Sequence, residues 1–314
     1  MIVYIVRRLG AGVGLVVSIS ILAFLLLGLS GQDVGRALLG INADEAAVAA
    51  KNHALGVDRP LIVQYVDWLL HAVRGDFGRS WFTSETVTTS IAQRLPVTLS
   101  LVVGVTIVTA VVSVALGVWA ATRGGAVDRF VQILAIAGYA LPGFLVTLFL
   151  VVVFAVNLRW FPAVGYIPFA QSPTGWLSTI TLPIIALSIG SIAGMAQQVR
   201  SSVLDVQNRD FVRTLRTRGL RTRSILWRHV MRNASAPALT IIGLQFVGLL
   251  GGAVLVEQIF GLPGIGNMTV QYTTRGDVPV IMGLLMVSVI GVVIVNLLVD
   301  VLIGLLNPKA RATA

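Results

Sequence analysis

Six long apolar windows separated by charged segments constrain the fold of this 314-residue chain more than any other feature. Each is roughly 20 residues long or slightly longer, which is the length that an α-helix needs to cross the hydrocarbon core of a bilayer. Five windows contain no charged side chain, and the sixth holds Asp300 near one end. The windows cover residues 9–29, 96–120, 131–156, 179–199, 237–256 and 281–303. The sequence therefore predicts an all-α polytopic membrane protein with six transmembrane helices.

Composition supports this fold class and leaves little room for another domain. Hydrophobic residues make up 56% of the chain and charged residues only 11%, against about 25% charged residues in soluble domains. The formal net charge of +10 is compatible with nucleic-acid binding, but the arginines gather at the ends of the apolar windows, as membrane topology requires. We therefore expect one transmembrane domain over residues 1–314 and no nucleic-acid partner. The lack of cysteine excludes disulfides and thiolate metal sites.

The distribution of basic residues predicts that both termini are cytoplasmic, because cytoplasmic loops carry an excess of Lys and Arg. With the termini inside, 15 of the 23 Lys and Arg residues fall on the cytoplasmic side. Most of the others lie in the long 31–95 loop, where the rule is weak. The first window follows Arg7 and Arg8 and is too long for a signal-peptide core, so a retained helix is favoured over a cleaved signal.

The 31–95 loop is predicted to be a small helical extracytoplasmic insertion between the first two transmembrane helices. Polar residues recur at spacings of three and four over residues 61–74, which is typical of an amphipathic helix. This helix could lie on the membrane surface or pack on the spans, and packing is favoured. Residues 44–55 are alanine-rich and also favour a helix. The 157–178 loop contains three prolines and is expected to be irregular.

The search for catalytic motifs is negative. The chain has two lysines, Lys51 and Lys309, and neither follows the glycines of a phosphate-binding loop. Its three histidines are scattered, and no Gly-x-Ser-x-Gly motif or pair of intramembrane carboxylates occurs. The second to fourth windows contain no ionisable group, so proton-driven transport is not indicated either. We therefore expect no enzyme and no bound cofactor or metal.

One dense basic segment, residues 200–232, contains nine arginines, one histidine and two acids. Part of it favours a helix that Gly219 can end, and Thr222 can begin a second helix. The charged residues that decorate the first helical stretch are Asp205, Asp210, Arg213, Arg216 and Arg218. The pattern fits two hypotheses, a docking surface for a soluble partner and a loop that binds lipid headgroups.

The basic segment resembles the cytoplasmic loop of ATP-binding-cassette importer permeases of the dipeptide, oligopeptide and nickel branch. The resemblance is carried by residues 210–233, DFVRTLRTRGLRTRSILWRHVMRN. Further stretches match in the same order: MIVYIVRRL (1–9), LGVDRPLIVQYVDWLLHAVRGDFGRS (55–80), RLPVTLSL (94–101), VEQIFGLPGIGNM (256–268), RGDVPV (275–280) and NLLVDVLIGLLNPKAR (296–311). The chain departs from the family at residues 213–215, which are Arg-Thr-Leu where other branches have Glu-Ala-Ala.

The resemblance implies a type I importer permease fold, a cytoplasmic coupling loop over residues 200–236, and location in the bacterial plasma (inner) membrane. The chain would form half of a translocation pathway and couple to an ATPase through residues 205–232. Implied partners are a second permease subunit, two ATPase subunits or domains that hold ATP and Mg²⁺, an extracytoplasmic substrate-binding protein and membrane lipids. Di- or oligopeptides are the expected cargo, with nickel chelates, haem and glutathione as alternatives. A secondary transporter or channel independent of ATP is the alternative from another class.

Residue roles follow from the resemblance and from position in the spans. The residues expected to couple to the ATPase are Asp205, Asp210, Phe211, Arg213, Thr214, Arg216, Arg218, Gly219, Leu220 and His229. The candidates for the pathway or a gate are Tyr139, Pro142, Pro183 and Glu257, although the prolines could merely be tolerated and Glu257 could anchor the loop at 261–266. Asn296 and Asp300 lie four apart on one helix face, where hydrogen bonding to another helix is favoured over proton relay.

Overall fold

The computed structural model describes residues 2–29 and 33–306. Residues 30–32 of the predicted insertion and the basic tail at 307–314 lie outside the described residues. Within the described ranges the regular structure is helical, and pairing of extended chain is confined to an isolated antiparallel bridge between Arg79 and Thr86. The predicted all-α class is confirmed.

Among the described residues, five helices are long and apolar enough to cross a membrane, and a bent pair of helices gives a sixth span if it is counted as one. Five unbroken helices each contain one predicted window: α1 (Ile2–Leu29), α5 (Val87–Arg123), α8 (Pro173–Gln207), α11 (Met231–Ile259) and α13 (Val278–Leu306). They extend past the windows because charged residues end an apolar window without ending a helix.

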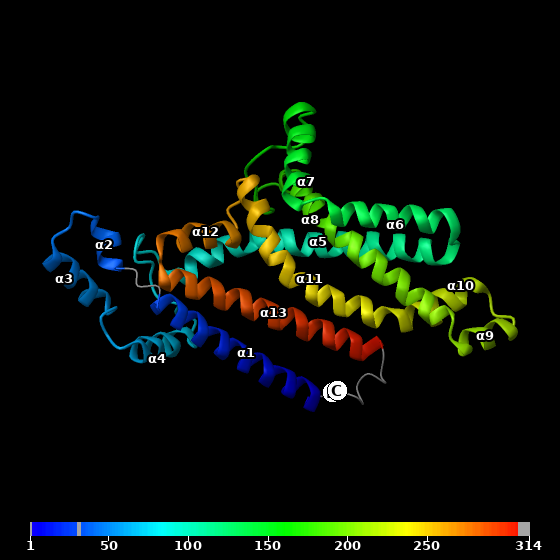
Figure 1. The fold of residues 1–314 in the computed structure, drawn as a ribbon, viewed down its shortest axis with the longest axis horizontal. Coiled ribbons are helices and arrows are strands. Elements are labelled where there is room, and N and C mark those ends of the chain that lie inside the picture. The colour runs from blue at the N-terminus through cyan, green and yellow to red at the C-terminus, as the bar shows by residue number, and fades with distance from the viewer. Residues whose placement is uncertain (1, 30–32, 307–314) are drawn as a thin grey trace. The chain divides into compact units, whose positions relative to one another are not determined.

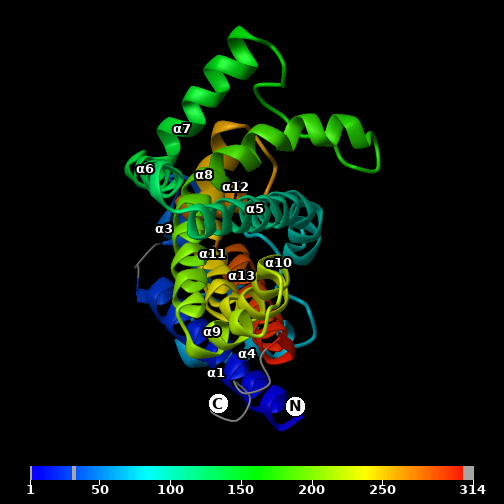
Figure 2. The same ribbon diagram turned by 90° about the vertical axis from the view of Figure 1, so that its right-hand side faces the viewer.

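The third window, 131–156, is not one continuous helix. It is divided between α6 (Gly125–Ala140), α7 (Gly143–Leu150) and the π-helical segment η1 (Val151–Asn157), with a bend of 96° between the two arms (Figures 1 and 2). Leu141 is extended, with φ −81° and ψ 120°, as the residue before a proline favours. Pro142 therefore produces the expected kink, and the predicted span corresponds to this bent pair, which gives six spans if it is counted as one.

The chain divides into two compact units, which are described separately. The first unit comprises Met1–Val6, Thr98–Leu262 and Val292–Ala314, and the second comprises Arg7–Val97 and Pro263–Gly291. The expectation of one domain over residues 1–314 stays a prediction.

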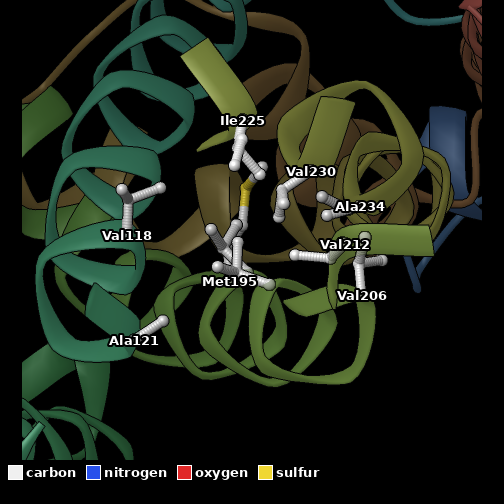
Figure 3. Close-up of a cluster of buried hydrophobic side chains, with 11 residues drawn as sticks. Val118, Ala121, Met195, Val206, Val212, Ile225, Val230 and Ala234 are labelled. Atoms are coloured by element: carbon white, nitrogen blue, oxygen red, sulfur yellow. The ribbon is translucent and has the colours of Figure 1, made fainter. Parts of the chain in front are cut away.

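The core of the first unit gathers buried side chains from α5, α8, α11 and the basic segment (Figure 3). The basic segment folds as α9 (Asp210–Thr217), α10 (Thr222–Ser224) and the π-helical segment η2 (Ile225–Val230), which continues into α11. The predicted succession of helix, turn and helix is confirmed. Val212 of α9 and Ile225 of η2 belong to the same cluster as Met195 and Val199 of α8.

The second unit contains α2 (Val34–Leu39), α3 (Glu45–Leu55), α4 (Leu61–Ala72) and α12 (Ile265–Arg275). Helices α3 and α4 confirm the predictions for 44–55 and 61–74. Helix α4 packs on α1. The Tyr65 ring of α4 lies 5.5 Å from the Phe24 ring of α1, and the Tyr65 hydroxyl lies 2.8 Å from Ser20 Oγ. Helices α2 and α12 were not predicted: α2 has only six residues, too few to show a periodicity, and the many polar residues of α12 obscure one.

Candidate functional site

Helix α9 has well-defined ends. Asp210 lies in its first turn and Arg216 in its last, which suits the helix dipole. After Arg218, Gly219 adopts the left-handed conformation with φ +76°. The Gly219 amide donates to the Arg216 carbonyl (3.0 Å), and the Leu220 amide donates to that of Leu215 (3.3 Å). These two bonds form a Schellman motif, so the prediction that Gly219 ends the helix is confirmed.

Asp205 lies on a different helix from the other charged residues of the predicted stretch. Helix α8 ends at Gln207, and α9 begins at Asp210. Between them, Arg209 is extended, with φ −74° and ψ 146°. The prediction that a single helix carries Asp205 together with residues 210–218 is therefore wrong.

Helix α9 is fixed to the spans through its apolar side. The Val212 side chain is 0% exposed and lies in a cluster with Val203 and Val206 of α8 and Val230 of η2 (Figure 3). Leu215 packs against the same cluster. A displacement of α9 must therefore carry the ends of α8 and α11 with it, because close-packed side chains transmit strain.

The remaining face of α9 and the turn after it are exposed. The predicted coupling residues exposed there are Asp210, Phe211, Arg213, Thr214, Arg216, Arg218, Gly219 and Leu220. Asp205 is also exposed, whereas His229 of η2 is half-buried. Within the part of the chain that the structure describes, no ion pair involves Arg209, Arg213, Arg216, Arg218, Arg221, Arg223 or Arg228. Their charges are thus available to a partner.

Trp227 is a further candidate that the sequence analysis did not select. It is 54% exposed and borders a shallow depression with Arg221, Arg223 and Ser224. Tryptophan and arginine are the residue types that most often dominate binding energy at protein interfaces. A tryptophan within a strongly basic segment was the signal that could have identified it.

An ion pair connects α8 to α6 close to this loop. The Arg200 guanidinium donates to both carboxylate oxygens of Asp128, with Nη2 2.6 Å from Oδ2. Gln132 Nε2 also donates to Asp128 Oδ2, at 3.0 Å. The side chains of Arg200 and Asp128 are 23% and 18% exposed, so this bidentate pair is largely protected from water and holds the start of α6 on α8.

A groove runs between α6, α8 and α11 within the same unit. It is shallow and widely open, with a volume of about 720 Å³. The residues that line it are Ile136, Tyr139, Ala140, Gly194, Gln197, Gln198, Ser201 and Ile241. Tyr139, a predicted pathway residue, is 69% exposed there. The sequence analysis missed the three polar residues of α8, although their positions place them on one helix face.

The other pathway candidates do not line this groove. Pro142 lies at the bend between α6 and α7, and Pro183 is buried inside α8. Glu257 is 0% exposed, and its Oε1 accepts a hydrogen bond of 2.6 Å from Thr98 Oγ1 of α5. This contact gives Glu257 a structural partner, and a gate role stays a prediction.

The two polar residues of the last span are placed on α13. Asn296 Oδ1 lies so close to Gly243 of α11 that a side chain there would meet it at 2.7 Å. Asp300 is half-buried. The position of Asn296 is consistent with a role in packing helices together.

The chain matches two protein-family descriptions over most of its length. Residues 113–312 match "Binding-protein-dependent transport system inner membrane component". Residues 1–102 match the corresponding N-terminal description, "Binding-prot-dependent transport system membrane comp, N-term".

Curated relatives match over nearly the whole chain. A putative peptide transport system permease protein of Brucella abortus is 37% identical, with 98% of both chains covered. A probable peptide ABC transporter permease protein of Sinorhizobium fredii is 38% identical over 98% of this chain and 99% of its own. The glutathione transport system permease protein GsiC of Salmonella typhimurium is 35% identical over 99% of both.

Among solved structures, a chain of the MetNI methionine ABC transporter in inward-facing conformations is similar in fold. The TM-score is 0.57 at 16% identity, and the match covers 69% of this chain and 96% of the MetNI chain. The likeness therefore supports the predicted type I importer permease fold.

Proposed function

Because the chain belongs to the binding-protein-dependent transport system inner membrane component family, we propose that it imports peptides as one permease subunit of an ATP-driven transporter, coupled to its ATPase through residues 205–232. Membership makes it an inner-membrane permease of an importer, as the sequence resemblance implied. The cargo, the coupling residues and the identity of the partners are the proposed parts.

The observation that carries the coupling proposal is the division of α9 into two faces. Val212 is buried in the core of the first unit, while Phe211, Arg213 and Arg216 are exposed on the other side. A helix that is fixed on one face and unpartnered on the other suits a role as a lever. Phe211, Leu220 and Trp227, which are 38%, 37% and 54% exposed, supply apolar anchors among the arginines. Such a mixed surface fits a groove in a soluble ATPase better than a lipid surface.

In the proposed cycle, ATP closes two ATPase subunits, and their movement displaces α9. The buried contacts of Val212 carry the displacement to α8 and α11. The Arg200–Asp128 pair carries it from α8 to α6, which leads to the bend at Pro142. Binding of ATP thereby favours one arrangement of the spans over another, which is how a ligand shifts a conformational equilibrium.

The proposed assembly contains this chain, a second permease subunit that completes the pathway, the ATPases and an extracytoplasmic binding protein. Cytoplasmic termini are proposed from the distribution of basic residues, which would place the α9 loop beside the ATPases. ATP and Mg²⁺ would be bound by the ATPases.

The names of the relatives support a peptide cargo. Those from Brucella abortus and Sinorhizobium fredii are named for peptide transport, and GsiC is named for glutathione, which is itself a tripeptide. Glutathione is therefore the second candidate cargo. Uptake of labelled tripeptides and of labelled glutathione by proteoliposomes that contain the full complex and its binding protein separates the two. If the complex transports neither compound, the peptide proposal is contradicted.

Reversal of charge on α9 tests the coupling proposal. We expect the double variant Arg213→Glu/Arg216→Glu to insert normally into the membrane but to lose ATP-dependent uptake, since like charges would face the ATPase. The matched control is Arg74→Glu/Arg79→Glu, which changes the same number of exposed charges in the 31–95 loop, where charge has little weight in topology, and it should retain uptake. Normal ATP-dependent uptake by the α9 variant would show that coupling occurs elsewhere.

A further inference from the structure

The groove between α6, α8 and α11 has a polar wall made by one helix. Gly194, Gln197, Gln198 and Ser201 of α8 recur at spacings of three and four residues and therefore share one face. Helix α8 is long and apolar enough to span a membrane. Polar groups on a spanning helix are costly toward lipid and normally face the protein interior or a water-filled cavity. Gln197 and Gln198 lie in the last turn of the 179–199 window and Ser201 lies just beyond it, so the stripe is at the end of the span, where it can meet a water-filled pathway.

The lining is mostly apolar, and the polar side chains in it are uncharged. All eight residues of the groove lack an ionisable carboxylate, ammonium, guanidinium or imidazole group, and its polar groups are two amides, one hydroxyl and the Tyr139 phenol. Each amide offers both N–H donors and a carbonyl acceptor, and each hydroxyl can do either. These are the groups that complement the alternating N–H and C=O of a peptide main chain.

Two contacts fix the shape of this wall. Gln198 Nε2 donates to Ser202 Oγ at 3.2 Å, which orients the amide while leaving its carbonyl oxygen as an acceptor. The Tyr139 hydroxyl lies so close to Gly194 that any side chain at this position would collide with it. Gly194 thus lets the phenol lie against α8.

We propose that this groove binds the main chain of the transported peptide through Tyr139, Gln197, Gln198 and Ser201, so that the permease accepts side chains of either charge. The volume of about 720 Å³ lies within the range of small-molecule sites. The inference rests on the proposed peptide import and adds the residues and the chemical basis of cargo tolerance.

A charge introduced into the groove tests this inference. In the reconstituted complex, Gln198→Glu should raise the ratio of uptake of Ala-Lys-Ala to Ala-Glu-Ala by roughly two- to fivefold over wild type, as expected for one partly exposed charge pair. The same binding protein serves both proteins, so its preference cancels in the comparison. Gln271→Glu is the matched control, because Gln271 is exposed on α12 outside the groove, and it should leave the ratio unchanged. An unchanged ratio in Gln198→Glu overturns the proposal.

Cysteine labelling provides an independent test, since the chain has no cysteine of its own. Gln197→Cys and Ser201→Cys should react with a hydrophilic thiosulfonate in the assembled complex, and Ala-Ala-Ala should slow the reaction. Ile185→Cys is the control, because Ile185 is 39% exposed but nine positions from Gly194, which places it on the opposite face of α8. Labelling that occurs in the isolated permease but not in the complex would mean that a second subunit fills the groove, which overturns the proposal.

The proposed function and the assignment of the groove are contradicted by different results. A wild-type complex that imports no peptide contradicts the proposed function. A wild-type complex that imports peptides, with an unchanged charge ratio in Gln198→Glu and no protection of the two cysteines, contradicts only the assignment of the groove.

Discussion

The helical insertion and the basic loop differ in how far their charged side chains form ion pairs among the described residues. In the insertion, Arg36 pairs with Asp33 and Glu45, and Arg59 pairs with Asp67. In the basic loop, the arginines between residues 209 and 228 have no ion-pair partner among the described residues. Charges that are satisfied internally support the fold of their own segment. Exposed charges of one sign without internal partners are suited to another molecule.

The same contrast applies to the buried contacts that support each region. In the second unit, Asp277 is 0% exposed and accepts hydrogen bonds from Ser80 Oγ (2.5 Å) and the Trp81 amide (3.4 Å). The basic loop is fixed by apolar packing of Val212 and Leu215 instead. Polar contacts are directional and specify one local geometry. Apolar packing holds α9 to its neighbours without using the polar groups that a partner would need.

The largest expected effect comes from breaking the apolar support of α9. Val212→Asp places a carboxylate in the buried cluster and should lower the free energy of unfolding by about 2 to 5 kcal/mol. ATPase subunits should no longer co-purify with the variant. Thr214→Asp is the control, since Thr214 is exposed on the same helix and its substitution should leave thermal stability almost unchanged. Equal stability of the two variants would refute the idea that α9 is anchored by Val212.

The next effect tests whether the ion pair between Arg200 and Asp128 is structural. Asp128→Asn and Arg200→Gln should each lower the free energy of unfolding by about 1.5 to 3 kcal/mol, as for hydrogen bonds to charged groups. The double variant should lose less than the sum of the two, because the residues share one interaction. Thermal unfolding of all four proteins measures the difference. If the loss of stability in the double variant equalled the sum of the losses in the two single variants, the interaction between Arg200 and Asp128 would contribute nothing to stability.

The polar support of the second unit should be of similar or smaller size. Asp277→Ala leaves the Ser80 hydroxyl and the Trp81 amide without their acceptor, which costs about 1 to 3 kcal/mol. Asp277→Asn keeps one oxygen acceptor and should lose less. Limited proteolysis within residues 75–86 provides a local measurement. If wild type, Asp277→Ala and Asp277→Asn were equally resistant to proteolysis, polar contacts would not support the second unit, and the contrast with the apolar support of α9 would be lost.

The smallest expected effect is a pH dependence of the insertion. His53 Nδ1 lies 2.6 Å from Asp58 Oδ2, and this hydrogen bond raises the pKa of His53 above its ordinary value of 6.5 and lowers the pKa of Asp58 below 3.8. The His53 contribution to stability is complete below pH 6.5 and is lost as pH rises through the raised pKa. The Asp58 contribution is present above 3.8 and is lost as pH falls through the lowered pKa.

Hydrogen–deuterium exchange of α3 measures this effect. Exchange, corrected for its intrinsic pH dependence, should increase slightly between pH 6 and pH 9 in wild type and not in His53→Gln. Because both side chains are exposed, the change should remain small. A response of the same size in the variant would exclude His53 as its source.

The positions of the spans were predictable from the sequence because a charged side chain in the bilayer centre is costly. The 61–74 helix and the end of α9 at Gly219 were also predictable, since local periodicity and glycine conformation determine them. The 96° bend after Ala140 was not, because Pro142 indicates a kink but not its angle. The separation of Asp205 from α9 depends on the extended conformation of Arg209, which no strong local signal marks.

The groove and the buried polar contacts were the least predictable features. Gln197, Gln198 and Ser201 look like ordinary polar residues near the end of a span until α6 and α11 are placed beside them. The contact of Asp277 with Ser80 joins residues 197 positions apart, and that of Asp128 with Arg200 joins residues 72 apart. A single sequence without an alignment carries no signal for such distant pairs. The family resemblance identified the function more readily than it identified these contacts.

The short connection between α8 and α9 limits how much movement can be lost between them. Only Asn208 and Arg209 separate Gln207 from Asp210, and two residues extend by no more than about 7 Å. The amides of both residues are already bonded to carbonyls of α8, at 3.2 Å each. The connection between α8 and α9 can therefore extend very little. Even a displacement of α9 shorter than one helical turn must move α8 instead of being absorbed by flexible chain.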